Sequence, residues 1–154
     1  EGRAAQMVED PAGLRVFHPD GGFFSATKRD FKHMVETVLI IEDNEKNLYL
    51  MEYLLKHAGM NTLSANSGVQ GLVMAKAERP SLILMDIQLP EMDGFETTRR
   101  LKQEPETCGI PIIAVSSFAT ESSRRAAQAA GVSAYIAKPI QPEQFIEQIK
   151  QFLP

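Results

Sequence analysis

The stretch from Leu82 to Gly94 constrains the fold of this chain most. Four apolar residues, 82–85, run directly into Asp86, and a loop punctuated by Pro90 and Gly94 follows. An unbroken apolar run of this length is typical of a strand buried on both faces, as in a parallel sheet. The pattern therefore predicts that the carboxylate of Asp86 lies at the carboxyl edge of a central strand, where open α/β sheets bind ligands.

Two other apolar runs also end in polar side chains. Val38–Ile41 leads into Glu42 and Asp43, and Ile112–Val115 leads into Ser116. Because the carboxyl ends of parallel strands meet at one edge of the sheet, these groups predict a site that binds a cation and an anionic group.

From Thr37 onward, strand-like and helix-like patterns alternate. We expect strands at about 37–42, 60–65, 82–86, 110–116 and 133–137, and helices at about 45–58, 67–78, 94–104, 119–130 and from 142 onward. Five such units predict an α/β fold, a parallel sheet with helices on both faces. The strand at 60–65 is the weakest and is expected at an edge.

The helix patterns also predict which side chains face the core. For the helix at 67–78, the expected inward residues are Val69, Leu72, Val73 and Ala77. The helix at 119–130 has almost no large apolar residue and is expected to pack loosely through alanines 126, 127, 129 and 130. Asp43 is also positioned to cap the helix that begins near residue 45.

Composition narrows the class of protein. A chain of 154 residues with 44% hydrophobic residues fits one domain with a real core. A net charge of −4 without a basic patch argues against nucleic acid binding. No apolar stretch approaches the roughly 18 residues needed to cross a membrane, and the N-terminus lacks the apolar core of a signal peptide. The single cysteine, Cys108, suits a reducing compartment, so we expect a cytoplasmic protein.

Residues 1–34 differ from the rest of the chain. Glycines and prolines punctuate them, and no periodicity is long enough to predict a helix or strand. We therefore expect an N-terminal extension, either a linker or a tag-derived segment, followed by a compact domain at 35–154. The alternative is an arm whose Phe23 and Phe24 dock on the domain or on a partner.

The polar groups at the strand ends predict a specific chemistry. Glu42, Asp43 and Asp86 would repel one another, so a cation must offset their charge or one acid must hold a proton. Oxygen ligands alone select a hard ion, and they favour Mg²⁺ over Ca²⁺ or Zn²⁺. Lys138 and Ser116 add an ammonium group and a hydroxyl. Together these groups are what phosphoryl transfer onto an aspartate requires.

From about Thr37 to Leu153 the chain resembles the response-regulator receiver domains of two-component signalling. Within that family it is most similar to the single-domain regulators of bacterial cell division and polarity. The resemblance rests on four segments in order, Val38–Asn44, Leu84–Pro90, Ile112–Ala119 and Ala134–Ile140.

The resemblance implies a flavodoxin-like, doubly wound sheet of five parallel strands in the order 2-1-3-4-5, with five helices. It implies that Asp86 is the phosphoacceptor and takes its phosphoryl group from a phosphohistidine on a sensor histidine kinase or a histidine phosphotransfer domain. Mg²⁺ would be bound by Asp43, Asp86 and the backbone carbonyl of Gln88, with Glu42 acting through water. It also implies a cis bond between Lys138 and the proline that follows it.

The remaining roles also come from the resemblance. Lys138 would pair with the phosphoryl group, and the backbone N–H groups of Gln88 and Ser117 would bind it. Ser116 would be the switch hydroxyl that moves toward it, and Tyr135 the aromatic side chain that then turns inward. For Tyr135 the alternative is ordinary packing with its hydroxyl in water.

We therefore expect a phosphorylation-switched binding module rather than an enzyme. No effector follows the last helix in this sequence, so output would pass to a downstream protein target. Catalysis would be limited to phosphotransfer to itself and slow autodephosphorylation, because the bulky Phe118 beside Gln88 cannot orient a water molecule. The alternatives are a receiver domain of a hybrid histidine kinase, a Mg²⁺-dependent phosphatase with Asp86 as nucleophile, and a receiver that is never phosphorylated.

Overall fold

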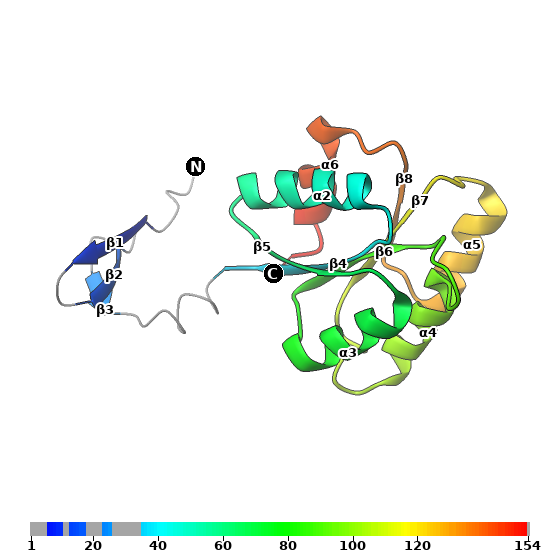
Figure 1. The fold of residues 1–154 in the computed structure, drawn as a ribbon, viewed down its shortest axis with the longest axis horizontal. Coiled ribbons are helices and arrows are strands. Elements are labelled where there is room, and N and C mark those ends of the chain that lie inside the picture. Colours follow the sequence, from blue (N-terminus) through cyan, green and yellow to red (C-terminus); the bar gives the residue numbers. More distant parts are fainter. Residues whose placement is uncertain (1–5, 11–12, 18–22, 26–34, 154) are drawn as a thin grey trace. The chain divides into compact units, whose positions relative to one another are not determined.

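The computed structural model describes residues 6–10, 13–17, 23–25 and 35–153. The chain divides into two compact units, Glu1–Val35 and Glu36–Pro154 (Figure 1). None of the helices in the described part of the chain is long and apolar enough to cross a membrane.

The first unit contains a small antiparallel sheet that the sequence analysis did not predict. Its strands, in the order β1-β2-β3, are β1 (Gln6–Asp10), β2 (Gly13–Phe17) and β3 (Phe23–Ser25). None of them contains an unbroken apolar run like Leu82–Met85, and pairing across the sheet defines them instead. The docking suggested for Phe23 and Phe24 concerns side chains outside the described part of the structure.

The second unit is built on five parallel strands in the order β5-β4-β6-β7-β8. They are β4 (Thr37–Ile41), β5 (Asn61–Ala65), β6 (Leu82–Asp86), β7 (Ile112–Ser116) and β8 (Ala134–Ala137). Numbered within this unit, the order is 2-1-3-4-5, which confirms the expected flavodoxin-like topology. The weak strand β5 lies at an edge, and β6, whose residues are all buried, lies at the centre.

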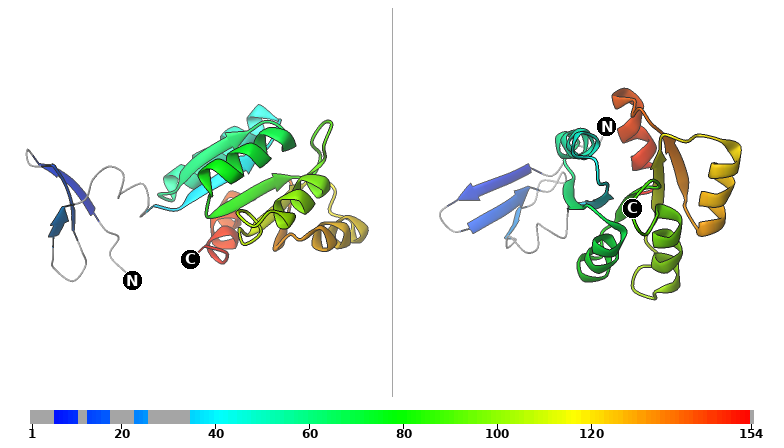
Figure 2. Two further views of the ribbon diagram at one scale, coloured as in Figure 1. Left: turned by 90° about the horizontal axis from the view of Figure 1, so that it is seen from below. Right: turned by 45° about the vertical axis from the view of Figure 1, so that its right-hand side comes forward.

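Five helices cover the two faces of this sheet (Figures 1 and 2). They are α2 (Glu45–His57), α3 (Gly68–Glu78), α4 (Gly94–Gln103), α5 (Glu121–Ala130) and α6 (Pro142–Lys150). One face packs against α2 and α6, through residues such as Met51 and Phe145. The other face packs against α3, α4 and α5, through residues such as Leu101 and Ala127.

Four of these helices begin after a residue with a short polar side chain. Such a side chain accepts a hydrogen bond from a free N–H group of the first turn. The N-caps are Asn44, Ser67, Asp93 and Thr120. The cap of α2 is therefore Asn44, whose side chain accepts hydrogen bonds from Lys46 N and Asn47 N, each at 3.1 Å. The suggestion that Asp43 caps α2 is wrong.

The predicted inward face of α3 is wrong for three of its four residues. Val69 and Val73 are 57% and 65% exposed and Ala77 is exposed, whereas Leu72 is half-buried and packs against the core as expected. The buried residues are Gly68, Gly71 and Ala75. A Cβ at Gly71 would lie 2.4 Å from Ile41 Cδ1. The helix thus lies too close to the sheet for large side chains on that face, and its valines point to solvent.

Helix α5 packs through even fewer groups than predicted. Of its four alanines named above, only Ala127 and Ala130 are buried. Two methyl groups bury little area, which is consistent with loose packing. Gly131, in the left-handed conformation at φ 117°, ends the helix.

Candidate functional site at the carboxyl edge of the sheet

The strand register brings the predicted site residues to one edge of the sheet. Ile41 of β4 pairs with Met85 of β6, so Glu42 follows β4 directly beside Asp86, the last residue of β6. On the other side, Asp86 pairs with Val115 of β7, and Ser116 pairs with Ala137 of β8. Lys138, which follows β8, completes the same edge.

Three carboxylates converge there. Oxygen atoms of Glu42, Asp43 and Asp86 all lie within 4.8 Å of one another. Glu42 and Asp86 are buried, and Asp43 is exposed. The exposed Asp43 thus places one side of the cluster at the surface.

Lys138 is the cation nearest to this cluster among the contacts of the described residues. Its Nζ lies 2.9 Å from Glu42 Oε2 and 3.6 Å from Asp86 Oδ1. The Lys138–Pro139 peptide bond is cis, as the family resemblance implied. One ammonium group among three carboxyl groups leaves the site short of positive charge.

The electrostatics of Asp86 reflect this excess of acid. Burial raises the pKa of its carboxyl group, and the charge of Glu42 raises it further. The N–H of Gln88, which donates to Asp86 Oδ1 at 3.0 Å, and the charge of Lys138 lower the pKa in part. The net shift of the pKa is upward, so the site favours protonation of Asp86 or the arrival of a second cation.

A hard divalent cation fits this donor set. Among the described residues the cluster contains carboxylate oxygens only, the ligands that Mg²⁺ prefers. A dication would remove the repulsion between Glu42 and Asp86 that raises the pKa of Asp86. The backbone carbonyl of Gln88 as a further ligand stays a prediction.

The backbone of Phe118 joins the two predicted switch residues through its N–H and its carbonyl group. Its N–H donates to Ser116 Oγ at 3.1 Å, and its carbonyl accepts the hydroxyl of Tyr135. Ser116 is buried at the end of β7, and its own carbonyl accepts the N–H of Lys138 at 2.8 Å. The loop after β7 is therefore bonded both to the site and to Tyr135. The side chain of Ser117, next in this loop, is exposed.

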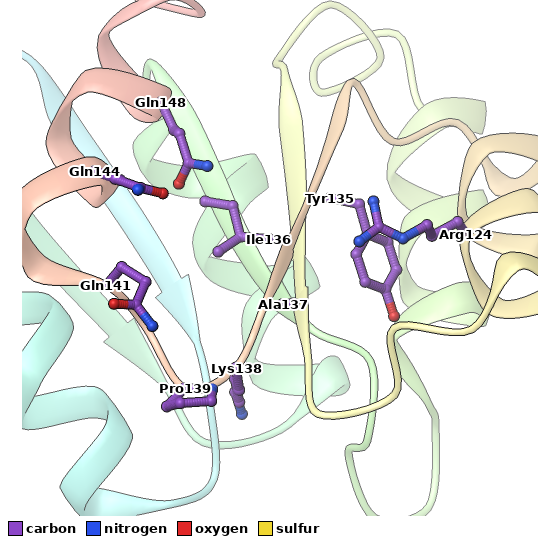
Figure 3. Close-up of a pocket in the computed structure, with 9 residues that line it drawn as sticks. All are labelled: Arg124, Tyr135, Ile136, Ala137, Lys138, Pro139, Gln141, Gln144 and Gln148. Carbon is purple, nitrogen blue, oxygen red and sulfur yellow. The ribbon is translucent and has the colours of Figure 1, made fainter.

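A groove of about 470 Å³ runs along β8 from Lys138 toward α5 and α6 (Figure 3). Gln141, Gln144 and Gln148 line it on the side of α6, and Arg124 on the side of α5. The guanidinium carbon of Arg124 lies 5.2 Å from the centre of the Tyr135 ring. The position of Arg124 was not predictable from the sequence, because no periodicity indicates which residue of an alanine-rich helix faces a neighbouring strand.

Comparison with known proteins places the chain in a family. The model of the response regulator receiver domain matches residues 38–150. The chain belongs to the response regulator receiver family. The polar-differentiation response regulator DivK of Brucella ovis is 44% identical over 120 residues, which are 78% of this chain and 98% of DivK. This receiver domain is therefore similar to a regulator of the polarity class that its motifs indicated.

Solved receiver structures share the fold. The receiver domain of the sensor histidine kinase PA1611 from Pseudomonas aeruginosa PAO1, solved with a magnesium ion coordinated in its active site cleft, is 29% identical with a TM-score of 0.72. The match covers 77% of this chain and 97% of that one. A CheY-like receiver domain protein from Methanospirillum hungatei JF-1 is also 29% identical, with a TM-score of 0.71 over 76% of this chain and 92% of that one.

Proposed function

We propose that this receiver domain accepts a phosphoryl group on Asp86 from a phosphohistidine of a sensor histidine kinase or a histidine phosphotransfer domain, and that it signals through altered contacts with a downstream protein. The observation that carries the proposal is the position of Asp86. Its buried carboxylate lies at the centre of the sheet edge, beside two acids within 4.8 Å and the ammonium group of Lys138 at 3.6 Å.

In the proposed transfer, a carboxylate oxygen of Asp86 attacks the phosphorus atom of the phosphohistidine. The new P–O bond forms as the P–N bond breaks, and the histidine nitrogen keeps the electron pair. The attacking oxygen must be unprotonated, so the raised pKa of Asp86 opposes the reaction unless positive charge compensates it. Lys138 supplies part of that charge.

Asp43, Asp86 and the Gln88 carbonyl would bind Mg²⁺ directly, and Glu42 would act through a bound water molecule. When bound, the ion supplies charge neutralisation for the carboxylates and for the phosphoryl oxygens. The N–H of Gln88 already points at Asp86 Oδ1, which supports a role in binding a group attached to that carboxyl. The N–H of Ser117 and the ammonium group of Lys138 would bind the remaining phosphoryl oxygens.

The loop after β7 would transmit the conformational effect of phosphorylation to the surface. For Ser116 to approach the phosphoryl group, its Oγ must leave the N–H of Phe118, to which it is now bonded. Tyr135, which donates to the carbonyl of the same residue, would then lose its partner and turn inward. The groove along β8 would change shape, and a protein target would bind the two shapes with different affinity.

The proposal is tested by intact-mass measurement after incubation with acetyl phosphate, with and without Mg²⁺. We expect the wild type to gain the mass of one phosphoryl group only when Mg²⁺ is present, and Asp86→Asn to gain none. Asp93→Asn, in a helix cap outside the cluster, is the matched control and should be modified normally. Equal modification of wild type and Asp86→Asn would refute the proposal.

A second possibility is that the natural protein is a hybrid histidine kinase in which this is the receiver domain. The similarity to the receiver domain of the sensor kinase PA1611 supports it, whereas the match to nearly the whole of DivK supports a separate regulator. The mass of the native protein in its own cells separates the two, since a hybrid kinase is several times larger.

A further inference from the structure

We propose that Arg124 is a positioning residue that holds Tyr135 in its outward orientation and so opposes the phosphorylation-linked switch. This inference rests on the proposed function. It assigns to the conformational change a controlling residue outside the phosphoryl site.

The contact between the two side chains is direct. The guanidinium group of Arg124 extends from α5 over the Tyr135 ring, with its central carbon 5.2 Å from the ring centre (Figure 3). A guanidinium group within about 6 Å of an aromatic ring centre is attracted to the face of the ring. In this orientation the half-buried ring directs its hydroxyl to the carbonyl of Phe118 in the loop after β7, and we call this orientation outward. A ring turned away from that loop would leave the guanidinium group.

Arg124 has little else to bind within the described part of the chain. No carboxylate there lies within ion-pair distance of it. Its neighbour Arg125 is different, because Arg125 Nη2 lies 2.5 Å from Glu121 Oε1. The two arginines are both exposed, so they form a matched pair in which only Arg124 contacts Tyr135.

The outward ring in turn holds the loop that carries the switch hydroxyl. Tyr135 donates its hydroxyl to the carbonyl of Phe118, and the N–H of Phe118 donates to Ser116 Oγ. Any contact that stabilises the outward ring therefore also stabilises the loop conformation in which Ser116 Oγ accepts the N–H of Phe118. Arg124 acts on the site through Tyr135 and Phe118.

When a ligand binds only one of two conformations, its apparent affinity falls in proportion to the fraction of molecules in that conformation. Loss of the Arg124 contact should therefore raise the population of the inward state. An exposed contact of this kind corresponds to about a two- to fivefold change in that population. The affinity for a phosphoryl mimic and the rate of phosphorylation should rise by a similar factor.

The test compares Arg124→Met, Arg124→Lys and Arg125→Met with the wild type. Each is assayed for the rate of phosphorylation by acetyl phosphate with Mg²⁺, by intact mass, and for the orientation of the Tyr135 ring, by NMR. We expect Arg124→Met to be about two- to fivefold faster, with more inward ring. Arg124→Lys, which keeps a cation over the ring, should be close to wild type, and Arg125→Met should be unchanged.

A second background separates positioning from a general effect of charge. In Tyr135→Ala, the further change Arg124→Met should have no effect on the rate, because the ring it acts on is gone. Equal rates for the wild type and Arg124→Met, or equal acceleration by Arg124→Met and Arg125→Met, would overturn the inference while leaving the proposed function intact. A wild type that acetyl phosphate cannot modify would overturn both.

Discussion

Lys138 and Glu42 form an ion pair of 2.9 Å at the carboxyl edge of the sheet, although 96 residues separate them in the chain. The pair is closer than that between Lys138 and Asp86, at 3.6 Å. In this structure the positive charge of Lys138 therefore offsets the negative charge of Glu42 more than that of Asp86. A phosphoryl group on Asp86 would compete with Glu42 for the same ammonium group.

Lys138→Met should destabilise the fold, because it leaves Glu42 buried without its partner. Removal of one member of a buried ion pair costs about 3 kcal/mol in the free energy of unfolding. Urea unfolding of the wild type and of Lys138→Met measures this loss in the free energy of unfolding. Lys76→Met, which removes the exposed ion pair with Glu104, is the control and should cost under about 1 kcal/mol. Equal losses in the two variants would contradict the compensation of Glu42 by Lys138.

Asp86→Asn should stabilise the fold near neutral pH in the absence of Mg²⁺. The raised pKa of Asp86 means that the folded state binds the proton more tightly than the unfolded state does, so the free energy of unfolding falls as pH rises through the folded-state pKa. Asparagine does not ionise. We expect a gain on the order of 1 kcal/mol, which should disappear below about pH 4, where the unfolded carboxyl is also protonated.

Urea unfolding at the two pH values, with Asp93→Asn as the control, checks this expectation. Asp93 accepts the N–H of Glu96 at a helix N-terminus, where a negative charge is favourable, so its replacement should give no gain. A gain from Asp86→Asn that is equally large at acidic pH would show that ionisation is not its cause.

The phosphoaspartate should hydrolyse slowly without a phosphatase. Phe118, which is 59% exposed in the loop after β7, is apolar and cannot orient a water molecule, and the exposed Gln88 flanks the same approach. Phe118→Ala and Gln88→Asn should therefore change the lifetime severalfold. The decay of the phosphorylated mass after removal of acetyl phosphate measures that lifetime. An unchanged lifetime in either variant would rule out this account.

Gly71→Ala should destabilise the protein because α3 lies so close to the sheet. The added methyl group would meet Ile41 Cδ1 at 2.4 Å and Cγ1 at 2.9 Å, and overpacking of this kind costs about 1–3 kcal/mol. Gly109→Ala is the matched control, since nothing lies within 4 Å of its added Cβ. Thermal unfolding compares them. A neutral Gly71→Ala would mean that α3 can move away from the sheet without cost.

The alternation of buried strands with capped helices was readable in the sequence. Because burial on both faces requires an unbroken apolar run, Leu82–Met85 indicated a central parallel strand, and the acid after it indicated the functional edge. The motif resemblance supplied the strand order, which the structure confirms, and the roles proposed for Asp86 and Lys138. The strand and helix pattern depends on local composition and on spacing along the chain, which a sequence displays directly.

What the sequence did not reveal depends on distances between elements. The spacing of the valines in α3 is typical of a core face. In the structure, Gly71 lies so close to Ile41 that this face has no room for large side chains, and the valines are exposed. The short strands of the first unit form only by pairing with each other. The contact of Arg124 with Tyr135 and the preference of Lys138 for Glu42 depend on side-chain positions that residues far apart in the chain set together. Local pattern thus determined the helices and strands of the second unit, and only packing in three dimensions decided which side chains meet.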